Sequence, residues 1–263
     1  MSTSSTHPTR QEQLAAMREF SNNTNARLPV LFLLDTSSSM NGIIRGDNQH
    51  IVRQEYADGI NWNIVTGDNM VTRMDELNTG LHRFVSDILA DPLAKLAADV
   101  AVITFARTVA TVKEFGPIRE SDTGLKISTS QENETFLGEA VELALSELDS
   151  RKRTYRAHGV EYYQPWLVVM TDGVPTSARH RELEGRLKEL MAARKLSVFV
   201  FGIGRADLSE LCSISPGRPP MRVNDQKFPE LFAWLSRSVR MASMSMPGDG
   251  VSLTPLPDDM WQV

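Results

Sequence analysis

The sequence predicts a doubly wound α/β fold, in which a mostly parallel sheet carries helices on both faces. Short runs of apolar, often β-branched residues recur along the chain, as at 30–34 and 166–170. These runs alternate with longer stretches in which apolar residues recur at spacings of three and four, the period of a helix. Strands that are apolar on both alternating sides are buried on both faces, which is typical of a parallel sheet between helical layers.

The N-terminal part of the chain contains the first strand and a stretch of unclear period. Residues 1–26 form a polar lead, rich in Ser and Thr at its start, in which 11–20 has the apolar spacing of a short helix. Residues 30–34 are continuously apolar and predict the first buried strand. Residues 43–68 mix glycines, asparagines and charged residues with isolated aromatic ones. We interpret them as a long loop or hairpin inserted after that strand.

The rest of the chain alternates between helices and strands. Apolar residues recur at helical spacing after Asp68, a suitable N-cap, and this helix is expected to stop near Asp91 and Pro92. Further predicted strands lie at 100–105, 108–115, 166–170 and 197–201, and further predicted helices at 136–148, 179–195 and 228–241. We expect one domain at 27–245 and, because 246–263 is rich in Pro and Gly, a weakly structured tail.

Composition narrows the classes of function. The chain has 263 residues, enough for one large α/β domain, and its formal net charge of −5 disfavours nucleic-acid binding, which depends mainly on Lys and Arg. A single cysteine, Cys212, excludes an intramolecular disulfide and a cysteine-based zinc site. No apolar stretch is long enough to cross a bilayer, and the first residues lack the apolar core of a signal peptide. We therefore expect a cytoplasmic protein with no membrane partner.

Polar, oxygen-bearing residues gather where predicted strands end or a predicted helix begins. Five residues share these positions: Asp35, Ser37 and Ser39 after the first strand, Thr135 before a helix, and Asp172 after the strand WLVVM. In a doubly wound sheet, ligands bind beyond the carboxyl ends of the strands, so these side chains are candidates for one site. Carboxylate and hydroxyl oxygens suit magnesium, calcium or manganese better than zinc or copper.

Each cluster also has a purely structural interpretation. The hydroxyl-rich run 35–39 can satisfy backbone groups in a turn. Thr135 can cap a helix, and Thr-Asp-Gly at 171–173 is a common turn sequence. The joint placement of all three clusters favours a shared binding site over three separate turns.

Three segments of the sequence together resemble the von Willebrand factor A domain and its metal-ion-dependent adhesion site. They are LPVLFLLDTSSSM, NETFLGEAVELAL and WLVVMTDGVPTS. The resemblance implies a Rossmann-like fold. It places the D-x-S-x-S motif of that family on Asp35, Ser37 and Ser39, its threonine on Thr135 and its later aspartate on Asp172. It also implies a bound divalent cation, expected to be Mg²⁺ with Mn²⁺ or Ca²⁺ as alternatives, which an Asp or Glu of a protein partner completes.

Within this family the chain is most similar to cytoplasmic bacterial proteins of the tellurium-resistance TerY type, a similarity that also includes the ending KFPELFAWLSRSV. Such proteins are associated with stress-response and phage-defence gene sets that include kinase- and phosphatase-like partners. This sequence departs from them at Ser38, where they usually have Gly, and in the inserted stretch 43–68. The insertion lies beside the predicted metal site and has three open interpretations: a partner-specific contact, a lid or a neutral insertion.

We therefore expect a non-enzymatic, metal-dependent protein-interaction module. The main alternative is a metal-dependent hydrolase or phosphatase of the haloacid-dehalogenase type, which also begins from an Asp after a first buried strand. That chemistry requires D-x-D, with the second Asp as general acid, and Ser37 stands in its place here. A nucleotide-binding switch is disfavoured because the sequence has no P-loop motif.

Overall fold

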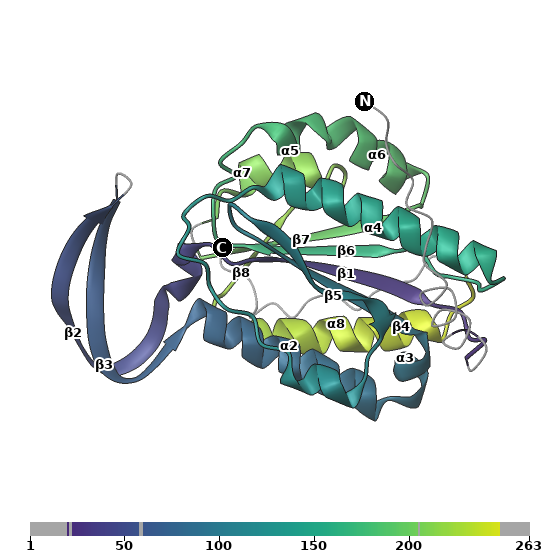
Figure 1. Cartoon of the computed structure of the whole chain (residues 1–263), viewed down its shortest axis with the longest axis horizontal. Helices are drawn as coiled ribbons and strands as arrows, with labels where there is room; N and C mark the ends of the chain where they lie inside the picture. The colour runs from purple at the N-terminus through teal and green to yellow at the C-terminus, as the bar shows by residue number, and fades with distance from the viewer. Residues whose placement is uncertain (1–19, 21–22, 58–59, 205, 248–263) are drawn as a thin grey trace.

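Two sheets organise the computed structural model, which describes residues 20, 23–57, 60–204 and 206–247. A six-stranded sheet in the order β5-β4-β1-β6-β7-β8 lies between two layers of helices, and β2 and β3 form a separate two-stranded sheet (Figure 1). This arrangement confirms the predicted α/β fold. The predicted helix at 11–20, apart from Phe20, and the predicted tail from residue 248 onward lie outside the described residues.

The elements alternate along the chain much as the hydrophobic pattern predicts. The strands of the large sheet are β1 (Leu28–Asp35), β4 (Ala98–Phe105), β5 (Val109–Pro117), β6 (Trp166–Thr171), β7 (Ser197–Ile203) and β8 (Met221–Val223). The α-helices are α2 (Arg73–Ala90), α3 (Pro92–Ala97), α4 (Leu137–Ala157), α5 (Arg179–Glu182), α6 (Glu184–Ala192), α7 (Leu208–Leu211) and α8 (Phe228–Ser243). None of the described helices combines the length and apolar character needed to cross a bilayer.

The order of the strands reverses at β1, in the middle of the sheet. β1 pairs in parallel with β4 on one side and with β6 on the other, and β5 is an antiparallel edge strand. The chain fills the β4 side first and then crosses to β6, with α2 on one face of the sheet and α4 on the opposite face (Figure 1). Such a reversal opens a crevice beyond the carboxyl ends of the two adjacent strands.

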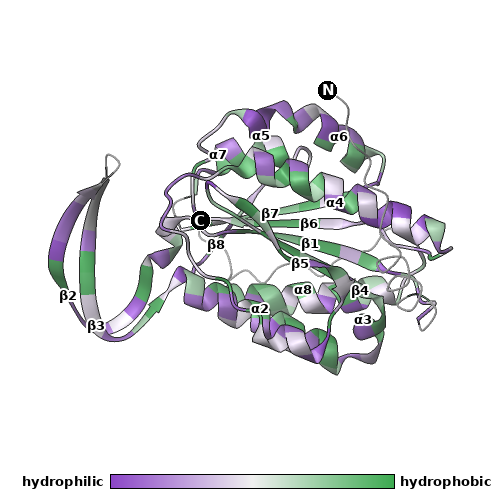
Figure 2. Ribbon diagram, in the orientation of Figure 1, coloured by the Kyte–Doolittle hydropathy of each residue, from purple (hydrophilic) through white to green (hydrophobic). Residues whose placement is uncertain are grey.

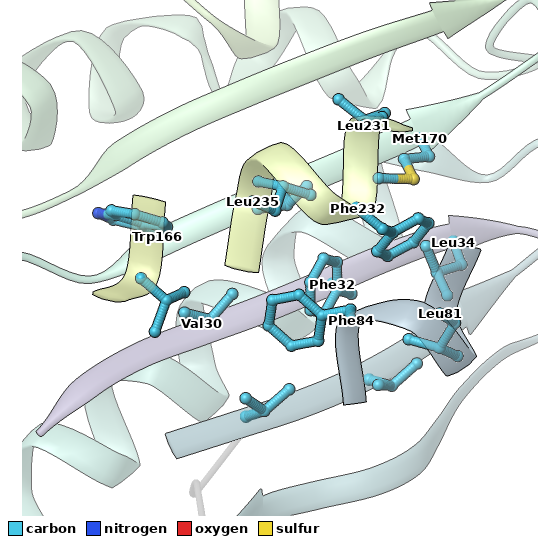
Figure 3. Packing of buried hydrophobic residues seen from close by; sticks show 14 of the residues in the cluster. Val30, Phe32, Leu34, Leu81, Phe84, Trp166, Met170, Leu231, Phe232 and Leu235 are labelled. Carbon is cyan, nitrogen blue, oxygen red and sulfur yellow. The ribbon is translucent and has the colours of Figure 1, made fainter. Parts of the chain in front are cut away.

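The side chains of β1 divide between two hydrophobic cores, one on each face of the sheet. Val30, Phe32 and Leu34 point toward α2 and α8, as Figure 3 shows. Leu31 and Leu33 point toward α4 and α6. Every residue of β1 is buried, which is why the strand has no polar residue before its last position.

The packing of α2 against α8 is close and involves aromatic rings. Phe32 lies edge-on to Phe84 with 5.1 Å between ring centroids, and 5.6 Å from the ring of Phe232 (Figure 3). A Cβ atom at Gly80 of α2 would lie only 2.3 Å from Cδ2 of Phe232. Glycine at this position therefore lets the two helices approach.

The inserted stretch is a β-hairpin that projects from the body of the molecule (Figure 1). Its strands are β2 (Ile43–Ala57) and β3 (Ile60–Thr72), which pair with several register shifts. Apolar segments alternate with polar ones along both strands (Figure 2). Among the hairpin side chains that the structure describes, the exposed large apolar ones are Ile51, Val52, Tyr56 and Ile64.

The prediction that Asp68 caps the first long helix is wrong. Asp68 lies inside β3, where it pairs with Asp47. The helix begins at Arg73 and its N-cap is Thr72, whose hydroxyl accepts a hydrogen bond from the N–H of Asp75. The Asp75 carboxylate in turn accepts from the N–H of Thr72, a reciprocal capping box that outcompetes the single aspartate.

The prediction of one helix at 179–195 is also wrong. Two helices, α5 and α6, are separated at Leu183, which is buried. His180 is buried as well, with one ring nitrogen bonded to the carbonyl of Ser177 and the other 3.3 Å from Glu210. These contacts hold α5 against the body and turn the chain between the two helices.

Candidate metal centre

The five predicted site residues come together beyond the carboxyl ends of β1 and β6. Asp35 is the last residue of β1, and Asp172 directly follows β6. Because β1 and β6 are parallel neighbours in register, with Leu34 opposite Met170, the two acidic residues leave the sheet side by side. Their position is the point at which the strand order reverses, where ligands bind in sheets of this kind.

The carboxylate of Asp35 is fully buried and accepts hydrogen bonds at both oxygens. Its Oδ1 accepts from the backbone N–H of Ser37 at 2.8 Å, which turns the chain as it leaves the strand. Its Oδ2 accepts from the hydroxyl of Thr171, the last residue of β6. These bonds fix the carboxylate at the junction of the two strands.

A chain of polar groups links the first loop to Asp172. The hydroxyls of Ser37 and Ser39 are 3.0 Å apart, and Ser39 donates to Oδ1 of Asp172 at 2.7 Å. Ser39 lies in the 3₁₀ turn η1 (Ser38–Asn41), which places its hydroxyl on the same side as that of Ser37. The motif spacing thus brings two hydroxyls and two carboxylates into one cluster.

Thr135 reaches the same cluster from the loop before α4. Its hydroxyl oxygen would lie 2.7 Å from a Cβ atom at Gly173, and Oδ2 of Asp35 would lie 3.5 Å from it. A side chain at position 173 would therefore clash with the hydroxyl of Thr135, next to the carboxylate of Asp35. Thr135 does not cap α4, whose N-cap is Phe136, and its backbone is held instead by Thr176.

Ser38 links the first loop of the site to the second. Its hydroxyl donates to the side-chain oxygen of Asn133, and its backbone N–H donates to the carbonyl of Glu132 at 2.8 Å. A third bond runs from the N–H of Ser130 to the carbonyl of Thr36 at 2.7 Å. The serine therefore supports the approach of the loop that carries Thr135.

The electrostatics of the cluster favour a bound cation. Burial, and then the charge of Asp172, raise the pKa of Asp35 to about 7. Burial also raises the pKa of Asp172, although the hydrogen bond from Ser39 and the charge of Arg73 oppose that shift. Ionising both of these buried, neighbouring carboxylates is costly in the folded protein, and a bound cation would lower that cost.

Arg73 also belongs to the site, although its position in the sequence does not predict this role. Its Nη1 donates to Oδ2 of Asp172 at 3.2 Å, and its Nε donates to Oδ2 of Asp225 at 3.1 Å. A long insertion separates Arg73 from the motif, so no spacing rule connects them. One feature of the sequence is weakly indicative. A positive side chain in the first turn of a helix is disfavoured by the helix dipole, so a nearby acidic partner is expected.

The donor set fits a hard divalent cation. Two carboxylates and three hydroxyls supply oxygen atoms only, which suits Mg²⁺, Mn²⁺ or Ca²⁺. No cluster of three or more His, Cys, Asp or Glu side chains with the geometry of a metal site occurs in the described part of the chain. The contacts at Gly173 show that the Thr135 hydroxyl and the Asp35 carboxylate, which come from separate loops, both lie close to the same backbone position.

The same fold occurs in known proteins. The family model for the von Willebrand factor type A domain matches residues 65–233, more than half of the chain. The match begins inside β3, so it includes Thr135 and Asp172 but not the motif that precedes the hairpin. No match was found among curated proteins.

Two solved structures illustrate the similarity of the fold. The conserved hypothetical protein BatB from Bacteroides thetaiotaomicron has a TM-score of 0.52 at 17% identity, covering 83% of this chain and 100% of that chain. Proximal thread matrix protein 1 from the mussel byssus has a TM-score of 0.50 at 16% identity, covering 84% of this chain. The chain spans about half the length of the mussel protein, 47% of it.

Proposed function

The chain belongs to the von Willebrand factor type A family, and from that premise we propose that it is a metal-dependent protein-interaction module. The proposed ligands of the cation are Asp35, Ser37, Ser39, Thr135 and Asp172. The proposed cation is Mg²⁺, with Mn²⁺ or Ca²⁺ as alternatives. When bound, it would offer a Lewis-acidic position to an Asp or Glu carboxylate of a protein partner.

One observation carries this proposal. Three loops that are far apart in sequence bring five oxygen-bearing side chains together at the reversal of strand order, with Thr135 and Asp35 both next to Gly173. Three independent turns would have no physical reason to converge in this way. They would also have no reason to bury two adjacent carboxylates at a cost to the metal-free fold.

The proposed ligands would contribute to cation binding in different ways. Asp35, anchored by Ser37 and Thr171, would supply the principal charge. The hydroxyls of Ser37, Ser39 and Thr135 would add neutral oxygen ligands. A site with few charges of its own holds a cation weakly enough for a partner carboxylate to contribute substantially.

The proposed role is non-catalytic. Catalysis of the haloacid-dehalogenase type needs a second acid two residues after the first. Here Ser37 holds that position and its hydroxyl is engaged with Ser39. Hydrolysis of a generic phosphate ester that is lost in Asp35→Asn would overturn this part of the proposal in favour of a metal-dependent hydrolase or phosphatase.

We further propose a bacterial, cytoplasmic setting of the tellurium-resistance TerY type. The support is the similarity of the motif segments and of the ending KFPELFAWLSRSV to that group. The proposed partner is a kinase- or phosphatase-like protein of the same stress-response or phage-defence gene set, which supplies the acidic residue. No nucleic-acid role is proposed, in keeping with the net charge of −5.

The experiment that tests the function is recovery of the native partner from cells that express the tagged chain. Recovery in Mg²⁺ should fall strongly in EDTA and in Asp172→Ala. A matched control is Glu189→Ala, which removes an exposed acidic side chain on α6, and should leave recovery unchanged. Equal recovery in Mg²⁺ and in EDTA, together with full recovery by Asp172→Ala, would refute metal-dependent recognition.

A further inference from the structure

Arg73 brings a positive charge into the candidate metal centre. Its guanidinium group bridges the carboxylates of Asp172 and Asp225, whose side chains are 2% and 18% exposed. The Arg73 side chain itself is only 22% exposed, so the bridge is largely shielded from solvent. A charge in this position acts on the site more strongly than a surface arginine would.

The surrounding backbone is shaped to hold this guanidinium. A Cβ atom at Gly42 would lie 2.5 Å from Nη1 of Arg73, and a Cβ at Gly204 would lie 3.0 Å from Nη2. Gly204 also has a positive φ of 56°, a conformation that favours glycine. Two glycines from separate loops therefore leave the room that the arginine head group occupies.

The same residue is fixed at the base of the hairpin. The backbone N–H of Arg73 donates to the carbonyl of Gly42 at 3.0 Å, which joins the two ends of the inserted segment. Its Nη1 donates to the carbonyl of Ser39 at 3.2 Å, in addition to Asp172. Backbone and side chain thus hold Arg73 against the loop that carries the metal motif.

Asp172 consequently divides its oxygens between two partners. Oδ1 accepts from Ser39, and Oδ2 accepts from Arg73. We propose that the fixed positive charge of Arg73 lowers the affinity of the site for a divalent cation, an inference that rests on the proposed function. It repels the incoming ion, and it occupies the second oxygen of Asp172. Asp225 moderates the effect by pairing with the opposite edge of the guanidinium.

Two variants that break the same ion pair therefore have opposite effects on the site. Arg73→Gln removes the positive charge and frees Asp172, so binding of Mn²⁺ should tighten, by about tenfold. Asp225→Asn leaves the guanidinium charge unbalanced, so binding should weaken, by roughly threefold. Arg73→Lys retains the charge but not the bridging geometry, so its effect on binding should be smaller than that of Arg73→Gln. If the ion pair between Arg73 and Asp225 had only a structural role, both substitutions would change the affinity for Mn²⁺ in the same direction.

The test is titration of the full chain with Mn²⁺, followed by calorimetry and by electron paramagnetic resonance of the free ion. Circular dichroism checks that each variant is folded, and Arg73→Lys and Asp225→Asn carry the test if Arg73→Gln is not. Opposite shifts support the inference. Shifts in the same direction, no shift in Arg73→Gln, or a tenfold change in Arg73→Lys would overturn it while the proposed function stands. A wild-type chain that binds no Mn²⁺ would overturn both.

Discussion

At the scale of single residues, the ionised carboxylate of Asp35 would favour cation binding but disfavours the folded, metal-free protein. Its carboxylate is fully buried next to Asp172, and its pKa is raised to about 7 by burial and by that neighbouring charge. In the unfolded chain the same group has its ordinary pKa of 3.8. The folded, metal-free protein therefore resists ionisation of the residue on which cation binding depends.

This conflict predicts how stability depends on pH when no cation is present. The folded state binds the Asp35 proton more tightly than the unfolded state, so the contribution of Asp35 is greatest below about pH 4 and is lost as the pH rises to about 7. The limiting slope is about 1.4 kcal/mol per pH unit. Urea unfolding in EDTA, wild type against Asp35→Asn, should show the variant gaining relative stability across this range.

A difference between wild type and Asp35→Asn that is constant from pH 4 to pH 8 would contradict this account of Asp35. The comparison matters because other acidic residues titrate in the same range. Only the part of the pH dependence that the substitution removes belongs to Asp35.

The sequence predicts which residues at the strand ends belong to the candidate site, but it does not predict the side chains that contact them. Asp35 and Asp172 were predictable because each directly follows a run of apolar residues whose burial leaves little freedom of placement. Thr135 was predictable as a polar residue in the loop before a helix, and the family resemblance then assigned it a place among the ligands. Arg73 was not predictable, because its role depends on where a hairpin ends and on the space at Gly42 and Gly204.

At the scale of elements, the contact between α2 and α8 depends on Gly80. Alanine usually stabilises a helix relative to glycine by about 1 kcal/mol. Here its Cβ would lie 2.3 Å from the Phe232 ring and 3.0 Å from the carbonyl of Phe228. Gly80→Ala should therefore lower the free energy of unfolding by about 1–3 kcal/mol, measured by urea denaturation.

Gly185→Ala is the matched control for that substitution. Gly185 lies in α6, and a Cβ there would meet nothing within 4 Å, so the helix preference of alanine should raise stability slightly. Equal effects of the two substitutions would mean that close packing at Gly80 is not what requires glycine.

The hairpin is the element most separable from the fold. Its two ends meet where Ile43 pairs with Thr72, and its strands carry exposed apolar side chains at Ile51, Val52, Tyr56 and Ile64. Replacing 44–71 by an Asn-Gly turn should keep the melting temperature within about 5 °C of wild type. It should also keep Mn²⁺ binding and reduce recovery of the partner.

Those outcomes separate the interpretations of the insertion. Loss of partner recovery with Mn²⁺ binding retained would identify a partner contact, because exposed apolar side chains on an isolated hairpin gain most from being covered. Unchanged recovery would leave a neutral insertion and contradict the prediction. The projection of the hairpin away from the body is unlike a lid (Figure 1).

The exact ends of helices and strands are harder to predict from the sequence than their presence. Asp68 is a residue type that often caps a helix. Here it instead pairs within β3 with Asp47 of β2, and the capping box at Thr72 begins the helix. The strand at Met221–Val223 has three residues, too few to display a period. Long buried strands and long amphipathic helices were predictable because tertiary packing and local pattern agree there.

At the scale of the whole molecule, the fold explains why a site stands where it does. The reversal of strand order at β1 places the ends of β1 and β6 together, with helices packed on the opposite faces of the sheet. Two separate hydrophobic cores hold the sheet rigid behind it. The loops that carry the candidate ligands are therefore positioned by the most deeply buried part of the protein.

The central claim is that these loops form one divalent-cation site, and Thr135 tests it most directly because it comes from a separate loop. Titration of the full chain with Mn²⁺ should show one bound ion, and Thr135→Val, a substitution of nearly equal shape, should weaken binding at least about tenfold. Thr154→Val, on α4, should bind like wild type. Equal binding by Thr135→Val and wild type, or no binding by wild type, would contradict the account.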